Sequence, residues 1–296
     1  QADCAFPVKG SSLRSTLSSV PACQSIVKKA VVKRLSAKYG IEHFEETGPM
    51  MRIQFAILKN CATVWIDTTG DPLYKRGYRA HGVLAPMRET LAFSMIDITR
   101  WRGDRPFADP FCGSGTIPIE AALYAKNIAP GLHRSFISEK WRIMPPHIYD
   151  DVREEVRSYE NRDLIPRIYA SDIDPRAVEL ARQNARKAGV LDYIDFSRCD
   201  MKDAPLFYDK GVIVCNPPYG ERLSDKKQME MLYRSIGQII KENDTWSFFL
   251  LSGYEEAQKM IGKKADKNRK IYNGMMKTYL YQYMGIKPPR RPAKDQ

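Results

Sequence analysis

The sequence GVIVCNPPY occupies residues 211–219, and it decides how the rest of the chain is interpreted. A short β-branched run leads into Asn216, Pro217, Pro218 and Tyr219, which predicts a buried strand that stops at a stiff turn. Each proline fixes its own φ and lacks an N–H, so carbonyl oxygens are left unpaired. The side-chain oxygen of Asn216, the Pro217 carbonyl and the flat ring of Tyr219 suit a planar group with an exocyclic NH2, such as a nucleobase edge or a carboxamide. For the tetrapeptide alone, a plain turn after a core strand is the alternative.

A glycine-rich turn follows an earlier short strand. Phe107 and Ala108 lead into DPFCGSGT at residues 109–116, and an Ala-rich helix is expected from 117 to about 126. Strand, glycine turn and helix in this order cradle a nucleotide-like ligand at the first βα connection. Pro118 stands where the dinucleotide fingerprint has its third glycine, which counts against a nicotinamide cofactor.

Acidic residues follow the next two predicted strands. Asp172 ends a strand at 167–171, and a helix begins after Pro175. A carboxylate at this place usually accepts hydrogen bonds from ribose hydroxyls, whereas Asp174 reads in part as the N-cap of the helix. Asp200 follows a third strand at 193–197, where an acid could accept the amino group of an adenine ring.

The order of elements predicts an α/β fold. Further strands are expected at 211–215 and 246–251, and Asn273-Gly274 predicts a hairpin between 269–272 and 275–283. Five βα alternations and a terminal hairpin indicate a doubly wound, mostly parallel sheet with an antiparallel edge.

A basic helix is predicted near the start, at residues 21–38, followed by a hairpin from 52–57 and 63–67. Basic residues crowd one arc of the helix and no acid interrupts it, which fits either a solvated polar face or a surface that contacts RNA. The chain has 47 Lys and Arg against 35 Asp and Glu, a net charge of +12 over 296 residues, which favours a polyanionic partner without excluding a merely basic soluble protein.

Several classes of protein are disfavoured by composition. Six cysteines lack any Cys-x-x-Cys spacing, so neither a zinc site nor a disulfide framework is expected, and a reducing cytoplasm fits best. No apolar run approaches the ~20 residues that span a bilayer, so no membrane segment is expected. The chain lacks an initiator Met, and we expect it to be part of a longer protein. Residues 132–163 read as an insertion without an assigned role.

These motifs together resemble those of S-adenosylmethionine-dependent amino-methyltransferases. More narrowly, the chain is similar to the THUMP-containing RNA methyltransferases, the bacterial family that methylates the N2 amine of guanine in large-subunit ribosomal RNA. The Phe6-Pro7-Val8-Lys9-Gly10 opening, the Lys28-Lys29 helix and the Arg76-Gly77-Tyr78-Arg79 connector also match. The departure is a further N-terminal stretch, normal in that family and absent here, which bears on RNA affinity but not on the methyl-transfer site.

The resemblance implies a seven-stranded Rossmann-like methyltransferase sheet. It divides the chain into a partial THUMP-like RNA-binding unit at 1–72, a connector and helix at 73–100, a methyltransferase domain at 101–285 and a basic, proline-rich tail at 286–296.

The resemblance also implies the site residues and their roles. The expected cofactor is S-adenosylmethionine, with RNA as partner and no metal. The expected cofactor-binding residues are Thr90, Asp109, Pro110, Phe111, Cys112, Gly113, Ser114, Gly115, Asp172, Ile173, Asp174, Asp200, Met201 and Asn216. The expected catalytic residues are Asn216, Pro217, Pro218 and Tyr219, and the expected RNA contacts are Lys28, Lys29, Lys33, Arg34, Arg76 and Arg79.

Three other functions stay open on the residues alone. The same tetrapeptide serves methyltransferases that act on adenine N6 of nucleic acid and on the N5 amide of a protein glutamine. A non-catalytic RNA-binding module on a vestigial fold is the third. Guanine is favoured over adenine by the resemblance and not by any particular residue.

Overall fold

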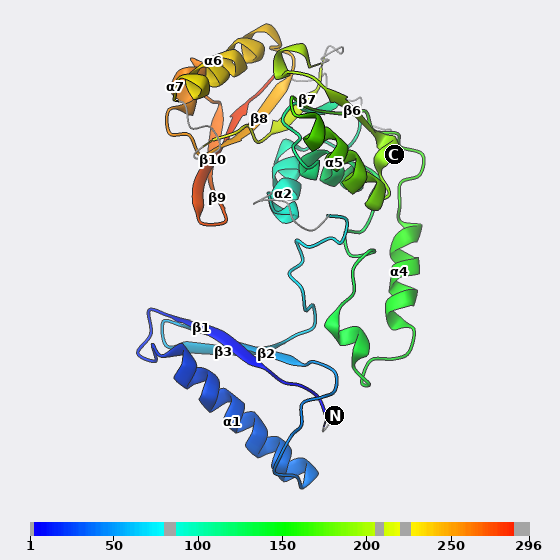
Figure 1. Cartoon of the computed structure of the whole chain (residues 1–296), viewed down its shortest axis with the longest axis vertical. Coiled ribbons are helices and arrows are strands. Elements are labelled where there is room, and N and C mark those ends of the chain that lie inside the picture. The colour runs from blue at the N-terminus through cyan, green and yellow to red at the C-terminus, as the bar shows by residue number, and fades with distance from the viewer. Residues whose placement is uncertain (1–2, 80–86, 205–209, 220–225, 287–296) are drawn as a thin grey trace, which may run out of the picture. The chain divides into compact units, whose positions relative to one another are not determined.

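The computed structural model describes residues 3–79, 87–204, 210–219 and 226–286. Figure 1 shows the ribbon with its elements labelled. The chain divides into two compact units: Gln1–Leu73 with Arg134–Glu155, called here the N-terminal unit, and Tyr74–His133 with Val156–Gln296, the larger unit. Each unit has its own sheet and its own buried apolar cluster.

The N-terminal unit contains a three-stranded sheet with one long helix on it. The strand order is β1-β2-β3, with β1 parallel and β3 antiparallel to β2. The helix buries Cys23 against Phe55 and Ile57 of the sheet. The elements are β1 (Val8–Leu13), α1 (Val20–Tyr39), β2 (Arg52–Leu58) and β3 (Cys61–Asp67). The expected helix and hairpin are both present, and β1 is an addition to them.

Local sequence explains the limits of α1. The Ser19 hydroxyl caps the first turn by accepting a hydrogen bond from the Ala22 N–H, and Pro21 lies in the first turn, where no donor is needed. Gly40 ends the helix in the left-handed conformation, with φ of 69°.

Residues 134–155, part of the segment without an assigned role, belong to the N-terminal unit. The Ser138 hydroxyl donates to the Thr68 carbonyl at 2.8 Å, and the Trp141 indole N–H donates to the Met50 carbonyl at 2.8 Å. These bonds tie a distant stretch of sequence to the β2–β3 hairpin. The segment forms the 3-10 helix η1 (Ile137–Lys140) and α4 (Ile148–Ser158), which continues past the unit boundary.

The larger unit is built on a seven-stranded sheet in the order β6-β5-β4-β7-β8-β10-β9. All neighbours pair in parallel except β10, which is antiparallel to both β8 and β9. The strands are β4 (Phe107–Asp109), β5 (Ile168–Asp172), β6 (Ile194–Arg198), β7 (Val212–Cys215), β8 (Ser247–Ser252), β9 (Lys267–Asn273) and β10 (Met276–Tyr283). The chain progresses from β4 toward β6 and then from β7 toward β9, so the strand order reverses between β4 and β7. Open α/β sheets bind ligands at the carboxyl ends of the strands at such a switch point.

Helices cover both faces of this sheet. On one face, α2 (Glu89–Thr99), α3 (Thr116–Ala125) and α5 (Pro175–Lys187) pack on alternate strand residues such as Phe107 and Val214. On the other, α6 (Lys226–Glu242) and α7 (Ala257–Ile261) pack on their neighbours, such as Ile213 and Phe248. Each large apolar side chain buried in these cores contributes roughly 1.5–3 kcal/mol. Short 3-10 helices are η2 (Leu191–Tyr193) and η3 (Met201–Asp203).

Details of the elements differ from the sequence expectation. The helix α7 was not expected because its five residues are too few to show a period. The hairpin turn lies at Gly274 and Met275, since Asn273 already pairs with Met276. Only the glycine of these two residues has positive φ (66°), as in a type II′ turn, which corrects the Asn273-Gly274 turn expected from sequence. The sequence also predicts that Pro86 opens α2, but this proline lies outside the described residues.

No helix within the described parts of the chain is both long and apolar enough to cross a membrane.

Candidate active site at the carboxyl edge of the sheet

The turn after β4 depends on two glycines with different requirements. Gly113 has φ of 51°, and a Cβ there would meet none of the described residues within 4 Å, so the turn is open to them on that side. Gly115 has φ of 83°, and a Cβ there would lie 2.9 Å from the Ala181 Cβ of α5. The first glycine therefore leaves room beside the backbone, and the second allows α3 and α5 to pack closely.

Asp172 joins this turn to the end of β5. One carboxylate oxygen accepts from the Gly113 N–H at 3.0 Å, and the other accepts from the Asp174 N–H at 3.0 Å. Asp174 in turn caps α5 by accepting from the Arg176 N–H at 2.9 Å. The side chain of Asp172 is therefore held at the edge where the strand order reverses.

Asp109 forms the floor of the same turn. Its side chain is fully buried, one oxygen accepts from the Phe111 N–H at 3.1 Å, and the other has no partner among the described residues. Burial raises the pKa of Asp109 well above its usual value, and the nearby charge of Asp172 raises it further. Burial and the charge of Asp172 thus both favour the protonated form of the Asp109 carboxyl.

The other end of the turn is fixed by a residue that the sequence analysis did not select as functional. The Asn184 amide on α5 is completely buried and donates to the Ser114 carbonyl at 2.9 Å. The sequence signal that could have identified Asn184 is its polar side chain on the apolar face of the helix predicted after Pro175.

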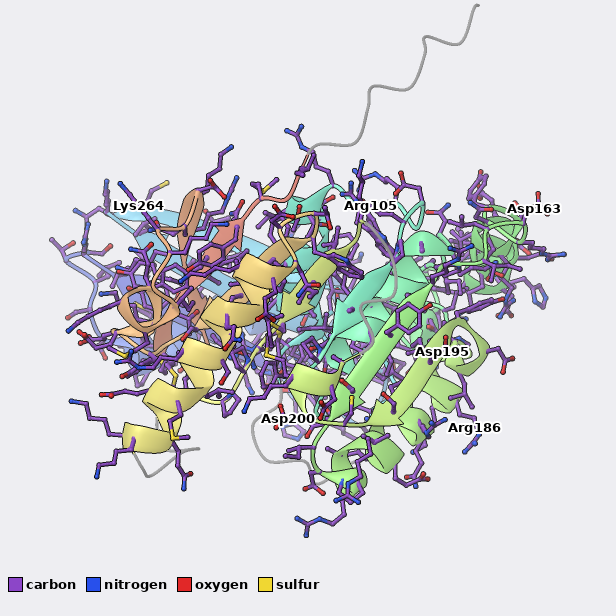
Figure 2. The ribbon with its side chains drawn as sticks, turned by 90° about the horizontal axis from the view of Figure 1, so that it is seen from above. Arg105, Asp163, Arg186, Asp195, Asp200 and Lys264 are labelled. Carbon is purple, nitrogen blue, oxygen red and sulfur yellow. The ribbon has the colours of Figure 1, made fainter. Side chains whose placement is uncertain are left out.

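An apolar surface lies next to Asp172. Ile173 is 65% exposed and lies in sequence between Asp172 and Asp174, both of which accept backbone hydrogen bonds. Asp200, labelled in Figure 2, follows β6 and accepts from the Lys202 N–H at 3.0 Å. A small hollow of about 10 Å³ lies nearby and is lined in part by Asp109, Pro110, Ser171, Ser197 and Met201, but not by Asp172, Ile173 or Asp200. The edge therefore combines carboxylates with an apolar plate, as a nucleoside requires.

The tetrapeptide after β7 lies at the same edge. The Asn216 side-chain oxygen is buried and has no hydrogen-bond partner among the described residues. A buried amide oxygen without a partner costs about 1–3 kcal/mol, so it marks a place where a donor is expected to bind.

Tyr219 is only 4% exposed in this state. Its hydroxyl accepts from the Asn273 amide at 3.2 Å, and its ring lies against Gly253, where a Cβ would come within 3.0 Å of it. The ring is therefore positioned by the β9–β10 hairpin and the end of β8.

The neighbouring thiols of Cys112 and Cys215 lack the properties of a nucleophilic cysteine. Burial raises the pKa of both Cys112 and Cys215, so neither carries the thiolate that a nucleophilic cysteine needs. No group of three or more His, Cys, Asp or Glu suited to a metal occurs in the described portion of the chain.

A buried ionic network lies behind the turn. The Arg79 guanidinium donates to the Thr116 hydroxyl at 2.8 Å and lies 3.4 Å from a carboxylate oxygen of Glu89. Arg76 pairs with Glu120 at 3.5 Å, and the Tyr78 hydroxyl donates to Glu120 at 3.1 Å.

The network bears on the roles expected for Arg76, Arg79 and Thr90. Arg76 and Arg79 were expected to contact RNA, but the structure places them in ion pairs with buried acids because Glu89 and Glu120 require compensation. Thr90, expected at the cofactor, is exposed in the first turn of α2, beside the buried Glu89. No local pattern pointed to Glu89 or Glu120.

The basic helix α1 presents most of its expected RNA contacts to solvent. Lys29, Lys33 and Arg34 are exposed. Lys28 is half-buried, pairs with Glu46 and lies 3.6 Å from the centre of the Phe6 ring. The arc of three free-standing cations is thus open, and Lys28 contributes mainly to packing within the unit.

The structure brings together most of the expected site residues. Those at the carboxyl edge of the sheet are Asp109, Pro110, Phe111, Cys112, Gly113, Ser114, Gly115, Asp172, Ile173, Asp174, Asp200, Met201, Asn216, Pro217, Pro218 and Tyr219. They come from the ends of four neighbouring strands.

The chain resembles known methyltransferases in sequence and in structure. A family model described as the RMKL-like methyltransferase domain matches residues 76–282. A Bacillus subtilis protein named "Putative RNA methyltransferase YpsC" is 46% identical over 293 residues, which cover 98% of this chain and 76% of that one. The ribosomal RNA large subunit methyltransferase K/L of Syntrophotalea carbinolica is 34% identical over 290 residues, covering 91% of this chain and 40% of that protein.

Two solved structures are similar over nearly the whole chain. One, from Listeria monocytogenes, is called a "predicted N6-adenine-specific DNA methylase"; it is 47% identical with a TM-score of 0.90, covering 96% of this chain and 74% of that one. The other, SMU.472 in complex with SAH, is 41% identical with a TM-score of 0.89, covering 97% of this chain and 76% of that one.

Proposed function

The chain belongs to the RMKL-like methyltransferase family, and on that premise we propose that it methylates the N2 amine of a guanine in large-subunit ribosomal RNA. Its cofactor is S-adenosylmethionine, and it acts on RNA. The finer assignment, to guanine N2 and to the large subunit, is supported by the names of the K/L relatives and by the expectations drawn from sequence. We propose that the reaction takes place in the cytoplasm, where ribosomal RNA is processed.

The residues at the carboxyl edge fit this cofactor. The open side of Gly113 leaves space for the methionine part, and the Asp172 carboxylate is held where it can accept ribose hydroxyls. Ile173 offers an exposed apolar face to the adenine, with Asp200 beside it. The cofactor supplies an electrophilic methyl group on a sulfonium.

The observation that carries the proposal is the buried, unpartnered side-chain oxygen of Asn216. An exocyclic amine is a weak nucleophile because its lone pair is delocalised into the ring. Acceptors such as the Asn216 oxygen and the Pro217 carbonyl would bind its two hydrogens and orient the nitrogen. Positioning of this kind can lower a barrier by roughly 7–11 kcal/mol, so no strong base is required at the tetrapeptide.

RNA binding is assigned to basic surfaces. The exposed cations of α1 and the net charge of +12 favour phosphate contacts. A base in structured RNA must be turned out to reach the edge of the sheet, at a cost of a few kcal/mol. Phosphate contacts would offset that cost.

The test uses ribosomal RNA from cells that lack this gene. The purified protein and labelled S-adenosylmethionine are incubated with that RNA, and the nucleosides are separated by mass spectrometry. N2-methylguanosine is the expected product. Label in N6-methyladenosine, or in a protein glutamine, would overturn the assignment in favour of one of the other substrates.

The second candidate, methylation of adenine N6 in nucleic acid, has one specific observation in its favour: the description of the Listeria structure. The same experiment with DNA and RNA in parallel separates the two. A non-catalytic role predicts that S-adenosylhomocysteine does not bind, which calorimetric titration decides.

A further inference from the structure

The β9–β10 hairpin extends past its neighbours at the edge that holds the site. β10 pairs with β8 over residues 279–283 but with β9 over residues 276–282. Residues 271–278 therefore project beyond the end of β8, by roughly 10 Å at the rise of a β-strand. Figure 1 shows the two strands reaching past β8 to a closed turn.

The direction of the strands places this projection beside the tetrapeptide. β10 runs antiparallel to β8, so the hairpin turn lies at the carboxyl end of β8, the edge that also carries Asn216. The Asn273 amide donates to the Tyr219 hydroxyl at 3.2 Å, and a Cβ on Gly253 would lie 3.0 Å from the Tyr219 ring and 3.3 Å from the Met276 sulfur. The hairpin is thus anchored directly to the site.

One face of the hairpin tip, residues 270–279, alternates lysine and tyrosine. Tyr272 pairs across the strands with Lys277, and Lys270 pairs with Tyr279. The Lys270 ammonium lies 5.2 Å from the Tyr272 ring centre, and the Lys277 ammonium lies 5.3 Å from that of Tyr279. Aromatic rings interleaved with cations are the combination that binds single-stranded nucleic acid.

The lysines of the hairpin tip could simply protect the exposed β9 edge from pairing with another chain, but this does not explain the exposed apolar side chains of the tip. Lysines on β9 would discourage pairing with another chain. The same need would keep apolar groups out of the projection, yet Tyr272 is 59% exposed and Met275, at the turn, is 99% exposed. Residues 263–277 contain six Lys or Arg and one Asp, so the surface is complementary to a polyanion.

We propose that the hairpin tip is a docking surface for the single-stranded RNA that flanks the target nucleotide. Tyr272 stacks on a neighbouring base, Lys270 and Lys277 contact its phosphates, and Met275 packs against the unstacked strand. This inference rests on the proposed function, because it needs a turned-out base at Asn216.

Binding is measured separately from catalysis, with a fluorescein-labelled, 20-nucleotide single-stranded RNA. Tyr272→Ala is expected to weaken binding roughly tenfold, as for loss of one stacked base. The double change Lys270→Glu and Lys277→Glu is expected to weaken it at least as much. It should also lower the slope of log affinity against log salt by about 0.7 for each lost phosphate contact. The affinity for S-adenosylhomocysteine stays unchanged in both.

The matched control is the double change Arg186→Glu and Lys187→Glu in the last turn of α5, which has the same change in net charge. Since α5 connects the parallel strands β5 and β6, its last turn lies at the amino edge of the sheet, whereas the hairpin tip lies beyond the carboxyl edge. Arg186 is labelled in Figure 2. The control is expected to bind within about twofold of wild type. Equal weakening by the control, or wild-type binding by the hairpin variants, would overturn the proposal.

A failure of the proposed function would give a different experimental result from a failure of the docking surface. If wild-type protein binds the RNA but does not methylate ribosomal RNA, the reaction assignment fails. Selective loss of binding in the hairpin variants would then still support the docking surface.

Discussion

The Asp172 carboxylate accepts a hydrogen bond from the backbone N–H of Gly113 at 3.0 Å, across 59 residues of sequence. This bond joins the end of β5 to the turn after β4, so two parts of one ligand site are held in fixed relation. The second oxygen of Asp172 accepts from the Asp174 N–H, which orients the carboxylate. A single side chain therefore links the two strand ends at which we propose that the cofactor binds.

We expect Asp172→Ala to weaken cofactor binding before it affects anything else. The change removes the acceptor for ribose and leaves the Gly113 N–H without its partner. A hydrogen bond to a charged group is worth about 1.5–3 kcal/mol, so the dissociation constant for S-adenosylhomocysteine should rise by roughly 10- to 150-fold. Calorimetric titration measures this, and a near wild-type constant would remove Asp172 from the cofactor site.

Asn216→Ala is expected to have the opposite signature. The side-chain oxygen has no partner in the described structure, so its removal should leave the melting temperature unchanged or slightly raised. The kcat should fall on the order of a hundredfold or more, as when one preorganised polar contact to a transition state is lost. Affinity for S-adenosylhomocysteine should stay near wild type. Parallel loss of cofactor affinity and kcat would indicate a structural role instead.

Arg79→Met tests the ion pair behind the glycine turn. Breaking a pair in which Glu89 is almost fully buried should lower the free energy of unfolding by about 3 kcal/mol, measured in urea. Adding Glu89→Gln should recover part of the loss, because no buried charge then remains unpaired. RNA affinity of the Arg79→Met protein at a temperature where it stays folded should match wild type. A selective loss of RNA affinity would restore the role that the sequence suggested for Arg79.

Elements that carry a local sequence signal could be predicted, whereas elements without one could not. Strand ends marked by glycine or by an acid carry a local signal, so the turn at Gly113 and the acid at Asp172 could be placed in advance. β1 lacks apolar alternation, since Gly10, Ser11 and Ser12 occupy its centre, and it was missed.

Long-range partners account for the contacts that the sequence did not predict. Arg76 pairs with Glu120, 44 residues away, and the Asn273 amide reaches Tyr219 across 54 residues. No window of sequence contains both members of either pair. The ion pair of Arg76 and the contact of the β9–β10 hairpin with Tyr219 therefore became visible only in the folded structure.

The pH dependence of stability should report Glu120. Burial raises the pKa of this carboxyl from 4.5 to about 7, against the opposing effect of Arg76. Between these two values the folded state binds more protons than the unfolded state, so the stability contributed by this group is full below pH 4.5 and is lost as the pH rises through 7. The loss amounts to at most about 3 kcal/mol.

Glu120→Gln isolates this effect from Glu89 and Asp109, whose pKa values are also raised by burial. The variant should lose less stability than wild type between pH 5 and pH 8, by urea unfolding at both values. Parallel curves for the two proteins would mean that Glu120 is already ionised in the folded state at pH 5.

Gly113→Ala and Gly115→Ala form a pair that separates ligand space from packing. Both residues have positive φ, so each alanine costs roughly 1–2 kcal/mol of backbone strain. At Gly115 the added Cβ would also meet the Ala181 Cβ at 2.9 Å, so this variant should lose clearly more stability. At position 113 the Cβ meets no atom of the described residues within 4 Å, and it projects into the space that we assign to the cofactor. Gly113→Ala should therefore lose more affinity for S-adenosylhomocysteine per unit of lost stability than Gly115→Ala. If both variants show the same ratio, the open side of Gly113 does not face the ligand.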